Sequence, residues 1–430
     1  MDHFVYRDGE IYAEDVPLSQ IAKDVGTPFY CYSTATLQRH YEVFARAVAP
    51  LDGDVFYAVK ANSNIAVIAL LAEMGAGADV VSAGELRRAL RAGIAAEKII
   101  FSGVGKTRLE LSEALRVGVK QINVESEPEL SLLSEVAVSL GQQANVAIRV
   151  NPDVDPGTHE KITTGKSENK FGIDLELARD VYARASALPG IKLIGVALHI
   201  GSQLTDLQPY RIAYKRAVDF VIELRQDGHD IRNLDLGGGL GITYDQETAP
   251  SPQAYGDMVK DVIGDLDINV AFEPGRMIVG NAGVLVTKVI FVKEGLARRF
   301  CVIDGAMNDL IRPTLYDAYH AIVPAREPKK DADLVEMDVV GPICESGDYF
   351  AKGRLLPPVQ DGELLVVRTV GAYASVMASM YNSRSLAPEV LVNGDQYSVV
   401  RRRIDVEDML KFESLPKWNK TTETEQVRSG

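Results

Sequence analysis

The feature that most limits the possible folds is a regular alternation between residues 55 and 273. Short apolar runs alternate with longer segments whose apolar residues recur three and four positions apart and which often end in glycine. This pattern predicts buried strands joined by amphipathic helices, and therefore a parallel sheet with helical crossovers. The strand-like runs are 55–59, 78–82, 98–102, 121–124, 145–150, 193–200, 233–236 and 269–273.

Eight such units favour a (β/α)8 TIM barrel, which typically needs about 250 residues. An open doubly wound sheet is the competing fold because its parallel strands are equally apolar. After residue 280 the apolar runs are separated by turns, which predicts a second domain, a β-rich sandwich or barrel. A chain of 430 residues has room for two or three domains. We therefore expect a barrel at 28–275, a β domain formed by 1–27 and 276–415, and a disordered tail at 416–430.

Two short segments have the pattern of β-hairpins. Residues 390–400, VLVNGDQYSVV, contain the Asn-Gly pair of a tight turn. Residues 4–14 contain a similar Asp-Gly pair, and we expect this N-terminal hairpin to pack with the β domain.

Composition excludes several classes of function. The chain has 46 Lys and Arg against 60 Asp and Glu, a formal net charge of −14, which argues against a nucleic-acid partner. Three cysteines are too few for a disulfide framework and indicate a reducing, cytoplasmic location. The polar, acidic start does not resemble a signal peptide, and no run reaches the roughly 18 apolar residues of a membrane helix.

Polar side chains stand at the ends of several predicted strands, where barrels of this kind collect their chemistry. The second strand carries Asp79, and the sixth is followed by Ser202. The strand ends also supply an amine, an imidazole, a glycine-rich turn, a carboxylate and a guanidinium, namely Lys60, His199, Gly237 to Gly239, Glu273 and Arg276.

This combination suggests pyridoxal 5'-phosphate as the cofactor. Lys60 can bond its aldehyde, Glu273 can hold its ring nitrogen protonated, and His199 can stack on its ring. Gly237, Gly238 and Gly239 allow a tight turn whose N–H groups face a phosphate, although a plain βα turn is the alternative. Each residue alone has an ordinary structural explanation. Their joint presence at the strand ends of one barrel favours binding of this cofactor over the separate structural explanations.

Six motifs in a fixed order then resemble a known family: FYAVKAN (56–62), HIGSQ (199–203), DLGGGLGI (235–242), EPGR (273–276), CESGD (344–348) and YNSR (381–384). The chain resembles the fold-type III pyridoxal-phosphate decarboxylases, and within them the diaminopimelate decarboxylase family, from about residue 25 to 412. The resemblance implies an alanine-racemase-type barrel followed by a β domain, and a homodimer with shared active sites.

The resemblance also implies roles for individual residues. Lys60, His199, Glu273 and Cys344 are the implied catalytic residues, with Cys344 donating a proton at the neighbouring subunit's site. A lone cysteine is more often a small buried hydrophobe. The implied cofactor-binding residues are Lys60, Asp79, His199, Ser202, Gly237, Gly238, Gly239, Glu273, Pro274, Gly275, Arg276 and Tyr373. The implied substrate clamp is Arg276, Arg312, Tyr316, Glu345 and Tyr373. No metal site is expected.

The implied reaction is decarboxylation of meso-2,6-diaminopimelate to L-lysine and CO2, the last step of lysine biosynthesis. The loop 151–172 also resembles this branch, although an expected aromatic residue near Lys161 is missing. One alternative is a decarboxylase of lysine, ornithine or carboxynorspermidine, against which Arg312 and Glu345 argue. The other is a non-catalytic pyridoxal-phosphate protein, against which the second domain and Cys344 argue.

Overall fold

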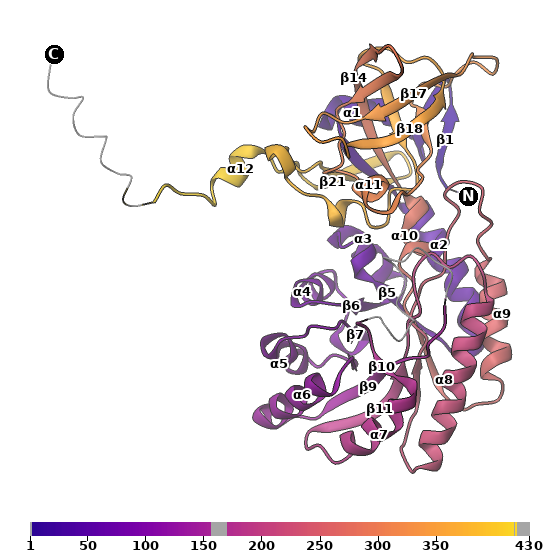
Figure 1. Cartoon of the computed structure of the whole chain (residues 1–430), viewed down its shortest axis with the longest axis vertical. Coiled ribbons are helices and arrows are strands. Elements are labelled where there is room, and N and C mark those ends of the chain that lie inside the picture. The colour runs from indigo at the N-terminus through magenta and orange to yellow at the C-terminus, as the bar shows by residue number, and fades with distance from the viewer. Residues whose placement is uncertain (1, 156–169, 417, 419–430) are drawn as a thin grey trace.

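The computed structural model of the protein describes residues 2–155, 170–416 and 418. Figure 1 shows two regions along the long axis of the molecule, a barrel surrounded by helices and a region built mainly of strands. The tail predicted at 416–430 falls almost entirely outside the described residues.

Within the described residues, the first region is a closed barrel of eight parallel strands. Each strand pairs with its neighbour in chain order, and β13 pairs back with β5 to close the ring. The barrel prediction is confirmed and the doubly wound sheet is excluded. The strands are β5 (Asp54–Ala58), β6 (Gly77–Val80), β7 (Ile99–Phe101), β8 (Gln121–Val124), β9 (Ala144–Asn151), β11 (Ile191–Ala197), β12 (Asn233–Asp235) and β13 (Asn269–Phe272). The short strand β10 (Ile173–Asp174) adds to β9 in parallel.

A helix follows each barrel strand, one more helix precedes the first strand, and together they surround the ring (Figure 1). Several of these helices begin at a Ser or Thr whose hydroxyl accepts a backbone N–H of the first turn, as with Ser82, Thr107 and Ser126. The helices are α2 (Thr34–Val48), α3 (Ile65–Glu73), α4 (Ala83–Arg91), α5 (Arg108–Val117), α6 (Glu127–Leu140), α7 (Leu175–Ala185), α8 (Gln208–Gln226), α9 (Pro252–Ile263) and α10 (Arg276–Val279).

The second region is a mixed sheet around the long strand β14 (Gly283–Glu294). The first half of β14 pairs with β4 and β19, and its second half pairs with β15. The other strands are β4 (Phe29–Ser33), β15 (Arg299–Ile303), β16 (Ile322–Pro324), β17 (Val335–Val340), β18 (Tyr349–Leu356), β19 (Leu364–Val367), β20 (Glu389–Asn393) and β21 (Gln396–Arg401). The short helices α11 (Arg312–Tyr316) and α12 (Val406–Leu410) lie in this half of the chain.

One segment lies in a different region from the one predicted. Residues from 28 onward were assigned to the barrel, but β4 lies between β14 and β20 of the second sheet. All five residues of β4 are buried. A short strand that is buried on both faces carries no pattern that says which of two neighbouring sheets it joins.

Both predicted hairpins are present. Strands β20 and β21 pair antiparallel, but Asn393 is paired with Gln396, so Gly394 and Asp395 form the turn rather than the predicted Asn-Gly pair. At the N-terminus, β1 (Phe4–Arg7), β2 (Glu10–Ala13) and β3 (Val16–Pro17) form a small antiparallel sheet that is followed by α1 (Leu18–Val25). This sheet packs on the β-rich region through an apolar cluster, and its contacts there include the isolated β-bridge Glu10–Arg326.

The barrel and the second sheet share one hydrophobic core. The main apolar cluster runs from barrel residues such as Tyr57 and Phe272 to Leu285, Val367 and Ala372 of the β-rich region. The carboxyl ends of the barrel strands therefore face a fixed surface of the second region. None of the helices formed by described residues is both long and apolar enough to span a membrane.

Candidate active site

The carboxyl ends of the barrel strands surround a cavity of about 410 Å3. Lys60 reaches it from a 3₁₀ turn directly after β5, and His199 and Glu273 reach it from the ends of β11 and β13. These three predicted residues therefore lie around one space. The cavity is lined by Lys60, Val81, Ser102, Gly103, Val104, Gly105, Asn123, Glu125, Arg149, Phe171, Ala197, Leu198, His199, Asp235 and Glu273.

The Lys60 amine is held by a buried carboxylate. Its Nζ lies 2.9 Å from Oδ2 of Asp79, whose side chain on β6 is fully buried, whereas the Lys60 side chain is 35% exposed. Burial lowers the pKa of Lys60, but the carboxylates of Asp79 and Glu273 outweigh burial and raise that pKa above its usual range. The lysine is therefore an ammonium oriented by Asp79.

Glu273 shares a hydrogen bond with a second buried carboxyl, Asp235. Asp235 also accepts hydrogen bonds from Asn123 Nδ2 at 2.8 Å and from the Gly237 N–H at 3.0 Å. Burial, Asp235 and Asp79 raise the pKa of Glu273 well above its usual range. Because the two donors stabilise charge on Asp235, the proton of the pair lies on Glu273.

Glu273 fits the predicted cofactor. Its buried carboxyl lines the cavity and, apart from the bond that it shares with Asp235, it has no hydrogen-bond partner among the described residues. A buried acceptor without a partner is costly unless a ligand satisfies it. A protonated ring nitrogen satisfies this acceptor, and Lys60 in the same cavity supplies the amine that an aldehyde requires.

The glycine turn is packed too tightly for side chains. A Cβ at Gly238 would lie 2.2 Å from the carbonyl oxygen of Glu273, and one at Gly239, where φ is +104°, would lie 2.3 Å from the carbonyl oxygen of Gly201. The turn is therefore more than a plain loop. Its N–H groups are not all free, however, because Gly237 donates to Asp235 and Gly238 donates to His199. The Gly239 N–H has no protein acceptor among the hydrogen bonds of the described residues.

His199 is a neutral ring at the wall of the cavity. Its Nδ1 accepts the Gly238 N–H at 3.2 Å, which places the ring proton on Nε2. Burial, Lys60 and Arg149 lower the pKa of His199 well below its usual range. A flat, uncharged ring suits stacking on an aromatic ligand.

A second cavity of about 200 Å3 contains the predicted clamp residues Arg276, Arg312 and Tyr316. The Arg276 guanidinium donates to the Tyr244 hydroxyl at 2.7 Å and to Ser202 Oγ at 3.0 Å. The cavity is lined by Gln203, Tyr244, Glu247, Arg276, Arg312, Tyr316, Ala318 and Tyr319.

The two arginines are buried without a carboxylate partner. Each is only 6% exposed, and no Asp or Glu oxygen of the described residues lies within 4 Å of either guanidinium. Burying a charge is costly unless it is paired. Two such charges side by side therefore form a site for an anion, and the planar guanidinium matches a carboxylate.

Tyr373 lines neither cavity but contacts residues beside both of them. The Arg276 guanidinium lies 4.8 Å from the centre of the Tyr373 ring. The backbone N–H of Tyr373 donates to the carbonyl of Ala61 at 2.8 Å, next to Lys60. Its φ of +54° is unusual for a residue with a side chain. The backbone at this position is therefore held in a strained conformation beside the predicted site.

Pro274 and Gly275 hold the strand ends together. The Pro274 carbonyl accepts the N–H of Ala58 at 3.2 Å. A Cβ at Gly275 would lie 3.0 Å from the Cβ of Ala61. These residues bring the Glu273 and Lys60 segments close to each other.

Two predicted residues do not lie at this site. Cys344 and Glu345 are exposed and line neither cavity. Cys344 differs in this respect from the other two cysteines, Cys31 and Cys301, which are buried. Burial raises the pKa of the Cys301 thiol to about 12, so that thiol is unreactive.

Several cavity residues were not predicted. Asp235 and Arg149 are charged residues within apolar strands. A charged residue inside an apolar run is visible in the sequence, so both could have been identified as candidates. Tyr244 comes from the long loop after β12, and His320 lies behind Arg312, where only the three-dimensional structure brings them together. The predicted loop 151–172 has its residues 156–169 outside the described part of the chain.

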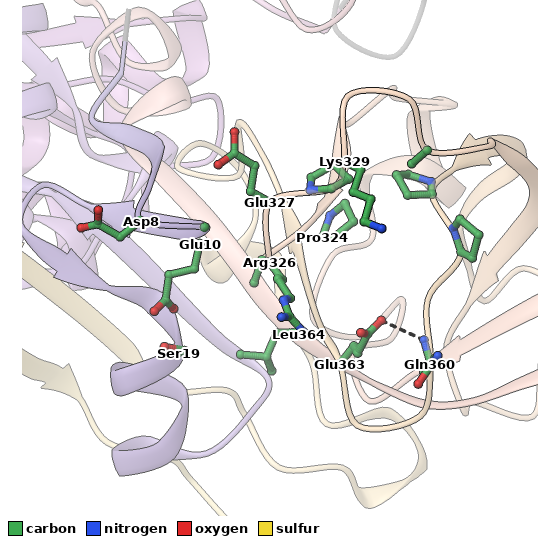
Figure 2. Close-up of a pocket in the computed structure, with 16 residues that line it drawn as sticks. Asp8, Glu10, Ser19, Pro324, Arg326, Glu327, Lys329, Gln360, Glu363 and Leu364 are labelled. Atoms are coloured by element: carbon green, nitrogen blue, oxygen red, sulfur yellow. Dashed lines mark hydrogen bonds between the residues drawn. The ribbon is translucent and has the colours of Figure 1, made fainter.

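A larger cavity of about 880 Å3 lies elsewhere, between the turn of the N-terminal hairpin and the loops 324–332 and 357–364 (Figure 2). It contains none of the predicted residues. Figure 2 shows both acidic and basic side chains around it, namely Asp8, Glu10, Glu327, Glu363, Arg326 and Lys329. This mixed lining does not define a ligand. The described residues also contain no group of three His, Cys, Asp or Glu side chains that could hold a metal ion.

Comparison with known proteins agrees with this geometry. The family model for the pyridoxal binding domain of pyridoxal-dependent decarboxylases matches residues 34–280. The chain is 50% identical to the diaminopimelate decarboxylase of Pseudomonas aeruginosa, over 96% of this chain and 99% of that protein. It is 47% identical to the diaminopimelate decarboxylase of Zymomonas mobilis, with the same coverage.

A solved structure shows the same similarity. The crystal structure of Helicobacter pylori diaminopimelate decarboxylase complexed with L-lysine superposes with a TM-score of 0.88 at 38% identity, over 92% of this chain and 98% of that one. The similarity therefore extends over both regions of the fold.

Proposed function

The chain belongs to the diaminopimelate decarboxylase family of pyridoxal-dependent decarboxylases, and from this we propose that it converts meso-2,6-diaminopimelate to L-lysine and CO2, the final step of lysine biosynthesis. The observation that carries the proposal is the pair of buried, unpaired arginines beside the lysine-bearing cavity. A substrate with a carboxylate at each end needs one end near Lys60 and the other at a cationic clamp. Arg276 and Arg312 supply that clamp.

Pyridoxal phosphate fits the first cavity, where Lys60 would bond its aldehyde, His199 would face its ring and Glu273 would meet its ring nitrogen. The glycine turn, where Gly239 has an unused N–H, would hold the phosphate together with Ser202 and Tyr373. When bound, this cofactor supplies an electron-withdrawing ring that accepts the electron pair left by departing CO2.

The protein's own residues orient the reaction. Asp79 fixes the position of the Lys60 amine at 2.9 Å. Glu273, desolvated and next to Asp235, holds a proton at the ring nitrogen and so maintains the electron-withdrawing strength of the ring. Arg276 and Arg312, with Tyr316 and Tyr373, grip the carboxylate at the far end of the substrate and fix which carboxyl group is lost.

Cys344 and Glu345 act at the cavity of a second subunit in this proposal. Both are exposed on a turn that Thr314 joins to α11 through a 2.5 Å hydrogen bond to the Gly347 carbonyl. A homodimer would place Cys344 where it protonates the carbon that has lost CO2. It would place Glu345 where its carboxylate accepts a hydrogen bond from the distal ammonium group. Three free thiols support a cytoplasmic location.

A decarboxylase of lysine, ornithine or carboxynorspermidine is the second candidate. Lysine and ornithine present an amine alone at the far end, and such an end does not satisfy two buried guanidinium groups. The deciding experiment is CO2 release by the purified, cofactor-loaded protein from meso-diaminopimelate, lysine, ornithine and carboxynorspermidine. We expect diaminopimelate to be the strongly preferred substrate. A preference for any of the others would refute the proposed function.

A further inference from the structure

His320 lies directly behind the clamp arginine Arg312 and is completely buried. The Arg312 Nε–H donates to His320 Nε2 at 3.3 Å. On the other side of the ring, His320 Nδ1 lies 2.9 Å from the carbonyl oxygen of Arg368. The Arg354 guanidinium donates to the His320 carbonyl at 2.9 Å and fixes the backbone there.

These contacts define the tautomer of the ring. A carbonyl oxygen can only accept, so the ring proton is on Nδ1 and the Nε2 lone pair faces Arg312. Burial and the positive charge of Arg312 lower the pKa of His320 to about 3, which agrees with a neutral ring. The edge-to-face contact with Tyr244, at 5.4 Å between ring centres, holds the ring in place.

The choice of a neutral acceptor matters for the charge of the clamp. Elsewhere the buried or half-buried arginines Arg149 and Arg401 bond the carboxylates Glu125 and Glu389. Such pairs are nearly neutral and attract an anion only weakly. A neutral imidazole orients Arg312 through a hydrogen bond but leaves its charge uncompensated.

The contact also determines which edge of the guanidinium is available. A carboxylate can bind arginine either at the Nε–Nη edge or at the edge formed by the two Nη groups. The Nε–H of Arg312 is committed to His320. The edge with two Nη groups is left for the cavity that Arg312 shares with Arg276 and Tyr316.

We propose that His320 is a positioning residue for substrate recognition, which holds Arg312 by its Nε so that both Nη groups and the full positive charge meet the distal carboxylate. This inference rests on the proposed function, because it assigns the carboxylate to a diaminopimelate or lysine molecule. His320 itself does not touch the substrate.

Two matched variants test the proposal. His320→Gln keeps a neutral acceptor near the Nε2 position and can still bond Arg312. His320→Asn keeps a donor near the Nδ1 position for the Arg368 carbonyl, but it is too short to reach Arg312. A merely structural role for the ring makes both variants equally defective.

The measurement is calorimetric binding of L-lysine to the holoenzyme, with pentane-1,5-diamine as a control ligand that lacks the carboxylate. We expect His320→Asn to weaken L-lysine binding about tenfold, with His320→Gln within a factor of about three of the wild type. Binding of the diamine and the absorbance of the cofactor should be unchanged. With meso-diaminopimelate, KM should rise in His320→Asn while kcat stays nearly constant.

Equal L-lysine affinities in the two variants, an equal loss of diamine binding, or no L-lysine binding by the wild type would each overturn the inference. If His320→Asn does not fold, a His320→Gln variant with wild-type melting but tenfold weaker L-lysine binding would overturn it as well. Failure of the proposed function is seen separately, as a wild-type holoenzyme that binds L-lysine but releases no CO2 from diaminopimelate.

Discussion

Lys106 and Arg149 are buried cations near the first cavity, and each bonds a carboxylate, Glu129 at 2.7 Å and Glu125 at 3.0 Å. Lys106 also donates to two backbone carbonyls, so its charge fixes the loop that lines the cavity. Arg276 and Arg312 have no such partner among the described residues. At the scale of single residues, this difference separates charges that hold the fold from charges that are kept for a ligand.

Glu273→Gln removes the carboxyl group that we place at the ring nitrogen of the cofactor. We expect kcat to fall by about 10²–10³, because an amide cannot stabilise the protonated ring. The cofactor should remain attached through Lys60, as judged by its absorbance after gel filtration. Glu127→Gln, on an exposed helix, is the control and should retain full activity. A Glu273→Gln enzyme with wild-type kcat would remove this residue from the mechanism.

His320 predicts a particular dependence of stability on pH. Its pKa is about 3 in the folded protein, owing to burial, against 6.5 for an ordinary histidine. Below pH 6.5 the unfolded chain therefore binds a proton that the folded chain does not, and stability falls as the pH falls. Between about pH 6.5 and pH 5, the wild type should lose about 2 kcal/mol of unfolding free energy that His320→Gln retains. Urea titrations at both pH values measure this difference, and parallel losses would contradict it.

Prediction from sequence succeeded for residues whose position follows from a single strand. Lys60, His199 and Glu273 lie around one cavity because parallel strands end at the same rim of the barrel. Tyr244 was missed because a long loop brings it to Arg312, and His320 was missed because the chain turns back after α11 and places it against Arg312. No local periodicity records such a contact.

At the scale of elements, the glycine turn after β12 is the part of the site that depends most on backbone shape. Gly238→Ala would place a Cβ 2.2 Å from the Glu273 carbonyl oxygen. Because that oxygen belongs to the backbone, relieving the clash requires a shift of the main chain, which costs free energy. We expect a loss of about 1–3 kcal/mol in unfolding free energy and at least tenfold weaker binding of pyridoxal phosphate.

Gly105→Ala is the matched control for this prediction. Gly105 lines the first cavity, but a Cβ there meets nothing within 4 Å. Thermal melting and equilibrium dialysis of the cofactor should show little change for this variant. If Gly238→Ala behaves like Gly105→Ala, the turn has no special role.

The barrel strands were predictable because each is a short apolar run followed by an amphipathic helix. The placement of β4 was not predictable in the same way. Its residues Phe29 to Ser33 are all buried, and the partners β14 and β20 lie more than 240 residues further along the chain. Packing in three dimensions decides which sheet such a strand joins. The local sequence pattern carries no information about partners that far along the chain.

At the scale of the whole molecule, each region supplies one arginine of the clamp, because Arg276 follows β13 of the barrel and Arg312 lies in the second region. Arg312, His320 and Tyr373 all follow β14, whereas Lys60 and Glu273 belong to the barrel. The shared hydrophobic core fixes these two groups relative to each other. The site therefore depends on both regions, and the role proposed for Cys344 also requires a second copy of the chain.

Mixing two defective variants tests whether sites are shared between subunits. Lys60→Ala and Cys344→Ala should each be nearly inactive on diaminopimelate. If each site combines Lys60 of one subunit with Cys344 of the other, an equal mixture after subunit exchange should regain about a quarter of wild-type activity. The CO2 release rate after brief denaturant treatment and refolding measures this recovery. A mixture no more active than its components would mean that both residues act in the same subunit or that Cys344 has no role.

In the proposed function, Lys60 carries the cofactor in the cavity at the rim of the barrel, beside Asp79 and Glu273. The most direct test is reduction of the holoenzyme with borohydride, followed by proteolysis and mass spectrometry of the peptides. We expect one peptide, containing Lys60, to carry a covalently attached pyridoxyl phosphate group. A label on a different lysine, or no label on a protein that releases CO2 from diaminopimelate, would contradict it.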